Sequence, residues 1–148
     1  MNKPVPITNF YNTFSKQMDA HGVTLLRIAL SIVFIWFGAL KVAGMSPAQQ
    51  LVEKTVSWLP GSTVVPALGA WEMLMGIGLL FKRFIPYTII LLLLHMAFTI
   101  MPLLLLTATC FKKFPWCPTL EGQYIIKNLV LVAAILVICG KYNFNKKE

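Results

Sequence analysis

The sequence predicts an all-α integral membrane protein, a bundle of four transmembrane helices with a short amphipathic helix between the first and second spans. Hydrophobic residues make up 57% of the 148-residue chain and charged residues only 12%. A soluble fold of this composition would lack the polar surface needed to cover its core. Apolar stretches long enough to cross a bilayer recur along the chain, with basic residues at their ends. These observations together indicate a multi-pass membrane protein.

The net charge of +8 does not indicate nucleic-acid binding. The basic residues flank apolar segments and do not line one polar face with aromatic residues between them. The partner that this pattern favours is the lipid bilayer. The sequence shows no Gly-rich phosphate loop, zinc-type Cys/His cluster, catalytic triad or pair of haem-ligand histidines. We therefore expect no metal site, and no cofactor motif is evident.

One domain is expected, because the chain length suits a single bundle. In the lead, Phe10, Tyr11, Phe14 and Met18 recur at helical spacing, so an interfacial helix and a loosely ordered terminus both stay open. The expected parts are a cytoplasmic lead at 1–22, a four-helix transmembrane domain at 23–140 with spans at about 23–43, 64–81, 86–107 and 123–140, and a cytoplasmic tail at 141–148.

Lysine and arginine in the short loops predict the orientation, since cytoplasmic loops carry an excess of these residues. The lead, the loop between the second and third spans, and the tail hold Lys3, Lys16, Lys82, Arg83, Lys141, Lys146 and Lys147. The other side holds Lys54, Lys112 and Lys113, with Lys41 at a helix end. Both termini are therefore expected in the cytoplasm, and the two longer loops outside it.

The first of these loops, residues 44–63, is too polar to span the bilayer. Residues 46–58 read as a short amphipathic helix, with Ser46 as N-cap and Pro47 at the first helical position. A connector at the interface and a lid over the bundle are both open, and the connector is favoured.

A carboxylate, Glu72, lies near the middle of the second span. Ionisable residues inside a membrane are costly unless they face the protein interior and have a partner. Helical spacing places Gly69, Glu72 and Gly76 on one stripe of that span. The other spans carry polar stripes that include Arg27, Ser31, Phe34, Gly38 and Lys41; Thr88, His95 and Thr99; and Tyr124 and Lys127 with Asn128 alongside.

Depth along each helix, at about 1.5 Å per residue, predicts which charges meet. Glu72 and Lys127 come out at overlapping depths, so an ion pair between them is expected, with His95 or Lys41 as a further partner. Arg27 lies too near the inner face to join them. The arrangement is either a structural polar clasp or a ligand-binding or proton-handling pocket. The candidate pocket residues are Glu72, Lys127, His95, Lys41, Trp36, Tyr124 and Asn128, and catalytic residues are not identified.

Two cysteines, Cys110 and Cys117, lie in the second outward loop, which is an oxidising compartment if the orientation holds. Their six-residue separation, with Pro115 and Pro118 nearby, favours a structural disulfide. A redox-active dithiol is the alternative, although no C-x-x-C pattern is present. Cys139 in the fourth span is expected to be an inert packing residue.

Three segments resemble the DoxX-like membrane proteins. Residues 26–41 are similar to the first helix of that family, with an early arginine and a Gly-x-x-Lys ending. Residues 71–80 resemble its second helix, with a buried glutamate followed by glycines, and residues 121–131 its fourth, where a lysine commonly follows an aromatic residue. The matching positions in this chain are Arg27, Lys41, Glu72 and Lys127.

The resemblance implies a four-helix bundle of the bacterial inner membrane. Members of the family are linked to redox and sulfur metabolism, and one is a subunit of a thiosulfate:quinone oxidoreductase. On this basis the leading hypothesis is a redox- or quinone-linked membrane subunit, an enzyme at most with a partner. A quinone is then the one cofactor suggested, and a redox enzyme or another membrane protein is the partner. The alternatives are a non-enzymatic scaffold or assembly factor, and small-solute or proton-coupled permeation; a homo-oligomer is left open.

Overall fold

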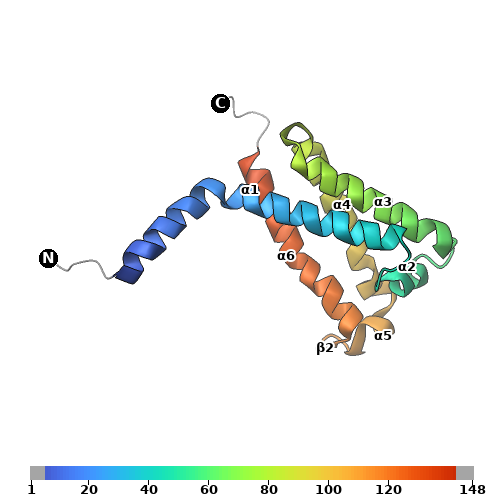
Figure 1. Cartoon of the computed structure of the whole chain (residues 1–148). Helices are drawn as coiled ribbons and strands as arrows, with labels where there is room; N and C mark the ends of the chain where they lie inside the picture. The colour runs from blue at the N-terminus through green and yellow to red at the C-terminus, as the bar shows by residue number, and fades with distance from the viewer. Residues whose placement is uncertain (1–5, 143–148) are drawn as a thin grey trace.

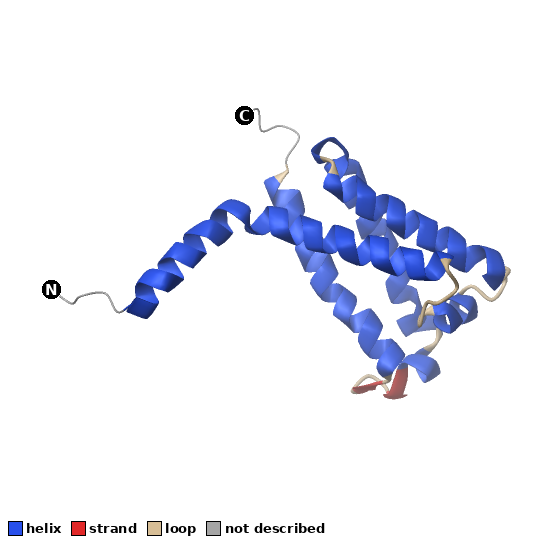
Figure 2. Cartoon of the chain, viewed as in Figure 1, coloured by secondary structure: helices blue, strands red, loops and turns tan. Residues whose placement is uncertain are grey.

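The structure is a computed structural model that describes residues 6–142. Four of its helices are long and apolar enough to cross a membrane, which confirms the predicted fold class. They are drawn with the shorter elements in Figures 1 and 2. In chain order the elements are α1 (Pro6–Val42), α2 (Gln49–Thr55), α3 (Gly61–Leu80), the 3-10 helix η1 (Lys82–Phe84), α4 (Ile85–Leu105), α5 (Thr107–Cys110), β1 (Phe111–Lys113), β2 (Cys117–Pro118) and α6 (Leu120–Lys141).

The connecting segments divide the bundle into two ends. The short helices α2 and α5 and the antiparallel β1–β2 hairpin gather at one end, which we call the loop end. The η1 turn between α3 and α4 lies at the other end with the last turn of α6, and we call this the η1 end (Figure 1). Each span therefore runs from one end to the other, as consecutive spans of a multi-pass protein must.

The closest helix pair is α1 with α3. A Cβ added at Gly38 of α1 would lie 2.5 Å from the carbonyl oxygen of Gly69, and one added at Gly69 would lie 2.5 Å from that of Gly38. Further along, the Ser31 hydroxyl donates to the carbonyl oxygen of Gly76 at 2.5 Å. Small residues let helix backbones approach in this way, and the approach fixes the register of the two helices.

The apolar core fills the space between the four spans from their middle towards the η1 end. Leu79, Ile85 and Leu92 are fully buried there, and Ile135 and Ile138 of α6 complete the cluster. Many other apolar side chains are exposed, including Leu74, Ile90 and Leu129. Outward-facing apolar residues on spanning helices are what contact with lipid requires.

The N-terminal part of α1 differs from the expected separate lead. The helix runs without interruption from Pro6 to Val42, and its first turns project away from the bundle beyond a bend (Figure 1). No proline interrupts the segment after Pro6, and the single Gly22 is tolerated within it. The described part of the lead is therefore helical and continues directly into the first span, and its place at the interface stays a prediction. The first five residues of the lead and residues 143–148 of the tail lie outside the described part of the chain.

A side chain caps the start of α6, whereas the predicted cap of α2 is not formed. Thr119 caps α6, because its side chain accepts a hydrogen bond from the Gly122 N–H at 3.2 Å. Ser46 does not cap α2: its hydroxyl accepts from the Ala48 N–H at 3.3 Å, which closes a turn before the helix begins. The helix is accordingly shorter than the predicted 46–58, since one turn uses its first residues and residues 56–58 form another turn after Thr55.

Candidate functional site

Three titratable side chains from three spans converge inside the bundle. Nζ of Lys41 on α1 lies 2.5 Å from Oε2 of Glu72 on α3, and Nε2 of His95 on α4 lies 3.2 Å from Oε1 of the same carboxylate. We call these three residues the charged cluster. Their exposed fractions are 8%, 6% and 5%, so all are enclosed by protein.

The geometry follows from the packing of α1 on α3. Gly69 has no side chain, so the Lys41 Cβ packs where a Gly69 Cβ would otherwise lie, 2.7 Å away. Gly69 is one helical turn before Glu72, and the lysine stem therefore reaches along α3 to the carboxylate. From the other side, the ring of Phe34 packs edge-on against His95, with centroids 6.2 Å apart.

Each oxygen of Glu72 thus has a nitrogen partner, which is the condition for a carboxylate to remain in an apolar bundle. Chemically, the cluster places one nitrogen group on each side of the Glu72 carboxylate: the Lys41 ammonium at one oxygen and the His95 imidazole at the other. Such an arrangement can hold a polar group or pass a proton between imidazole and carboxylate.

The ion pair predicted between Glu72 and Lys127 is wrong. Lys127 is exposed on α6, and its Nζ lies over the ring of Tyr124, 5.4 Å from the centroid. Depth counting gave only the position along the membrane normal, and α6 packs mainly against α4. Its buried face is the one with Ile125, Ile135 and Ile138, so Lys127 lies on its flank.

Three other predicted pocket residues lie away from the charged cluster. Trp36 and Tyr124 are each 64% exposed, so they point outward from the bundle. Asn128 is half-buried and donates to the Thr99 hydroxyl at 3.4 Å, which joins α6 to α4. Of the seven candidates, the structure brings together Lys41, Glu72 and His95. That these three residues bind a ligand or handle protons stays a prediction.

Arg27 occupies a separate place near the η1 end. Its Nη1 donates to the Tyr142 hydroxyl at 3.1 Å, and the guanidinium lies over the same ring, 5.4 Å from its centroid. Its Nε is buried and has no hydrogen-bond partner within the described residues. The sequence placed Arg27 apart from Glu72, but the contact with Tyr142 went unpredicted because Tyr142 follows the expected end of the fourth span.

A pocket of about 180 Å³ opens at the loop end beside the charged cluster. The end of α1, the start of α2 and the first turns of α3 form its walls, through residues that include Lys41, Gln49, Ser62, Val65 and Pro66. Lys41 belongs to both the pocket and the cluster. Sequence reasoning did not find the pocket, because it depends on how the first loop folds back on α3.

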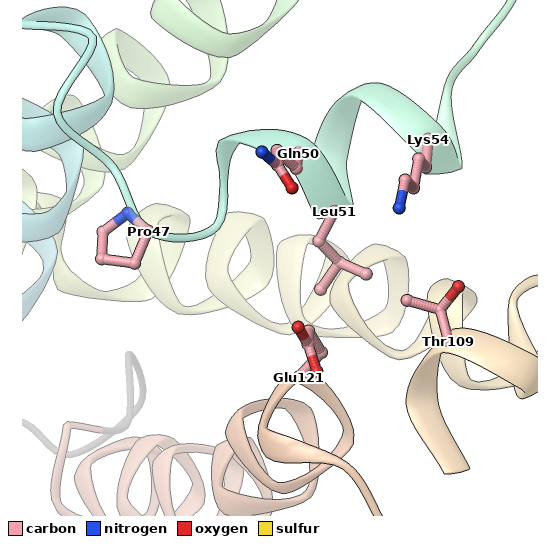
Figure 3. Close-up of a pocket in the computed structure, with 6 residues that line it drawn as sticks. All are labelled: Pro47, Gln50, Leu51, Lys54, Thr109 and Glu121. Atoms are coloured by element: carbon pink, nitrogen blue, oxygen red, sulfur yellow. The ribbon is translucent and has the colours of Figure 1, made fainter. Parts of the chain in front are cut away.

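A smaller pocket, of about 60 Å³, lies between α2, α5 and the start of α6 (Figure 3). Figure 3 shows Lys54 of α2 and Glu121 of α6 as the charged groups around it, with Thr109 from α5. It has room for only a few water molecules. Within the described residues, no group of three or more His, Cys, Asp or Glu side chains is arranged to hold a metal ion.

The predicted disulfide is not formed in the structure. Cys110 is buried and its Sγ donates to the carbonyl oxygen of Pro102 at 3.5 Å, whereas Cys117 is exposed on β2. The two side chains point in different directions because Cys110 ends α5 facing the bundle. Burial, together with the nearby negative charge of Glu121, raises the pKa of the Cys110 thiol. Cys139, also free, is exposed on α6 instead of packed as expected.

The four spans and the buried cluster define a multi-pass membrane protein with an intramembrane charged centre. The family model DoxX matches residues 22–108, which is more than half of the chain, and the chain belongs to the DoxX family. The match runs from the bundle part of α1 to α5 and includes all three cluster residues. Comparisons with curated proteins and with solved structures find no match.

Proposed function

We propose that this chain is a bacterial inner-membrane subunit that serves a redox- or quinone-linked process together with a partner that supplies electrons. The observation that carries the proposal is the buried Lys41–Glu72–His95 cluster with the pocket beside Lys41. A structural ion pair needs no adjoining cavity, whereas a ligand site does.

The residues of the cluster fit the chemistry of a quinone head group. Quinone carbonyl oxygens accept hydrogen bonds, and an ammonium group has three N–H donors, of which the contact with Glu72 uses one. In this proposal Lys41 binds a carbonyl oxygen from the pocket. Glu72 and His95 hold the lysine in place, and they keep protons close to the Lys41 N–H group that would bind the quinone. A bound quinone would supply the electron-accepting chemistry.

The test is quinone retention in protein purified into lipid nanodiscs. We expect wild-type protein to retain quinone, and Lys41→Met and Glu72→Gln to lose it while keeping the elution profile of folded protein. Lys127→Met is the matched control, because it removes an intramembrane lysine that lies outside the cluster. Extraction and chromatographic quantification of quinone per protein would give the result.

The second candidate is a scaffold or assembly factor in which the cluster only fixes the helices. Its supporting observation is that both Glu72 oxygens are already paired within the chain. This account expects Lys41→Met and Glu72→Gln to unfold at lower temperature with quinone content equal to that of wild type. That outcome would contradict the quinone-linked proposal.

A further inference from the structure

The pocket at the loop end and the charged cluster share one residue, Lys41, and this places a cavity with both polar and apolar walls next to the lysine of the buried ion pair. Lys41 is 8% exposed, lines the pocket, and contacts Glu72 through its Nζ. We propose that the pocket is a hydrated vestibule, through which water and small hydrophilic solutes reach the charged cluster from the loop end alone.

The size and lining of the pocket support hydration. A water molecule needs roughly 10–15 Å³ of cavity volume and two to four polar partners. The pocket has about 180 Å³, enough for several water molecules. Its polar groups include Lys41 and the side chains of Gln49 and Ser62. Pro66 has no N–H to donate to the Ser62 carbonyl oxygen, so this acceptor also lacks its usual partner within the helix.

Towards the η1 end, the bundle is closed by apolar side chains. Met75 lies one turn beyond Glu72 on α3 and is 2% exposed, and Leu79 on the next turn is fully buried. Leu92 and Ile135 pack in the same cluster from α4 and α6. Access to the charged cluster is therefore one-sided.

Two buried positions on α3 provide a matched test. Val65 lines the pocket and Met75 lies in the core, yet each is 2% exposed and both are on the same helix. In a background with Cys110, Cys117 and Cys139 replaced by serine, Val65→Cys and Met75→Cys would be treated with a membrane-impermeant methanethiosulfonate sulfonate. Ser62→Cys, at an exposed position of the pocket, reports which face the reagent has reached.

Over the same time of treatment with the reagent, we expect complete modification of Val65→Cys and none of Met75→Cys. Val65→Cys should be modified only in vesicles whose orientation also allows modification of Ser62→Cys. An unmodified Val65→Cys beside a modified Ser62→Cys would show a dry pocket and overturn the proposal. Equal modification of Met75→Cys, or of Val65→Cys from both faces, would overturn one-sided access.

The inference concerns the same cluster as the proposed function, but its test requires no ligand and no electron transfer. Loss of the quinone proposal would leave the labelling pattern unchanged. Conversely, quinone retention by wild type together with an unmodified Val65→Cys in quinone-depleted protein would leave the quinone proposal standing and overturn the hydrated vestibule.

Discussion

At the scale of single residues, the two intramembrane lysines have opposite roles. Lys41 is buried and neutralises Glu72, whereas Lys127 is exposed beside Tyr124. Removing one member of a buried pair leaves the other charge without compensation, a loss of about 3–5 kcal/mol in typical cases. An exposed substitution usually changes stability by no more than about 0.5 kcal/mol.

Lys41→Met is therefore expected to lower the free energy of unfolding by about 3–5 kcal/mol, and Lys127→Met to leave it within about 0.5 kcal/mol of wild type. The double variant Lys41→Met with Glu72→Gln should recover part of the loss, because the uncompensated charge is gone. Thermal unfolding in one detergent measures all three. Equal losses for the two lysine variants would show that the assignment of the partner is wrong.

The labelling of the free thiols should depend on pH. Burial and Glu121 raise the pKa of Cys110, so at a given pH it holds less of the reactive thiolate than an ordinary thiol. In folded protein, maleimide should label exposed Cys117 before Cys110, and labelling of Cys110 should rise only at higher pH. Mass spectrometry of the alkylated peptides would show the order. Labelling of both cysteines only after reduction would instead establish the disulfide that the structure lacks.

At the scale of helices, the contact between α1 and α3 positions the charged cluster. A methyl group at Gly38 would meet the Gly69 carbonyl oxygen at 2.5 Å, so Gly38→Ala must force the two helices apart. Overpacking of this kind costs about 1–3 kcal/mol, and we expect that loss in unfolding experiments. Gly140→Ala is the control, because a Cβ there meets nothing within 4 Å. A stable Gly38→Ala variant would mean that the helices are less tightly held than they appear.

Helix α1 as a whole is too long for the membrane core. Its 37 residues make a helix of about 55 Å, against about 30 Å of hydrocarbon. Ile7, Phe10, Tyr11 and Phe14 form an exposed apolar stripe on the projecting turns. A stripe of this kind is typical of a helix at a lipid–water interface. Phe10→Trp should therefore be quenched by brominated lipid more strongly than Asn12→Trp on the opposite face. Equal quenching would place the segment in water or fully in the bilayer.

The sequence predicted this architecture well because composition and helical period act locally. The stripes that carry Lys41 on α1, Glu72 on α3 and His95 on α4 follow from spacing alone, and the structure turns them inward. The predicted partner of Glu72, Lys127, was wrong because depth along the membrane normal does not give the rotation of α6 about its axis. The pocket, the Ser46 turn and the direction of Cys110 depend on contacts between segments distant in the chain, which spacing does not encode.

For the whole molecule, the orientation in the membrane depends on how the basic residues divide between the two ends of the bundle. The η1 end holds Lys82, Arg83 and Lys141 close to the spans, and the loop end holds Lys54, Lys112 and Lys113. When only the basic residues close to the spans are counted, the two ends carry similar positive charge. The prediction of a cytoplasmic η1 end therefore rests on Lys16 and on the basic residues outside the described part of the chain, Lys3, Lys146 and Lys147.

Green fluorescent protein fused after Glu148 should therefore fluoresce in cells, whereas alkaline phosphatase at the same position should be inactive, because it requires an oxidising compartment. The reverse pattern would invert the molecule and turn the pocket towards the cytoplasm. Replacing Lys146 and Lys147 with glutamine tests the cause: if these charges set the balance, part of the population should invert, since the charges near the spans do not favour one side. In the expected orientation, the pocket and Cys117 face the outside, so the charged cluster exchanges water with that compartment alone.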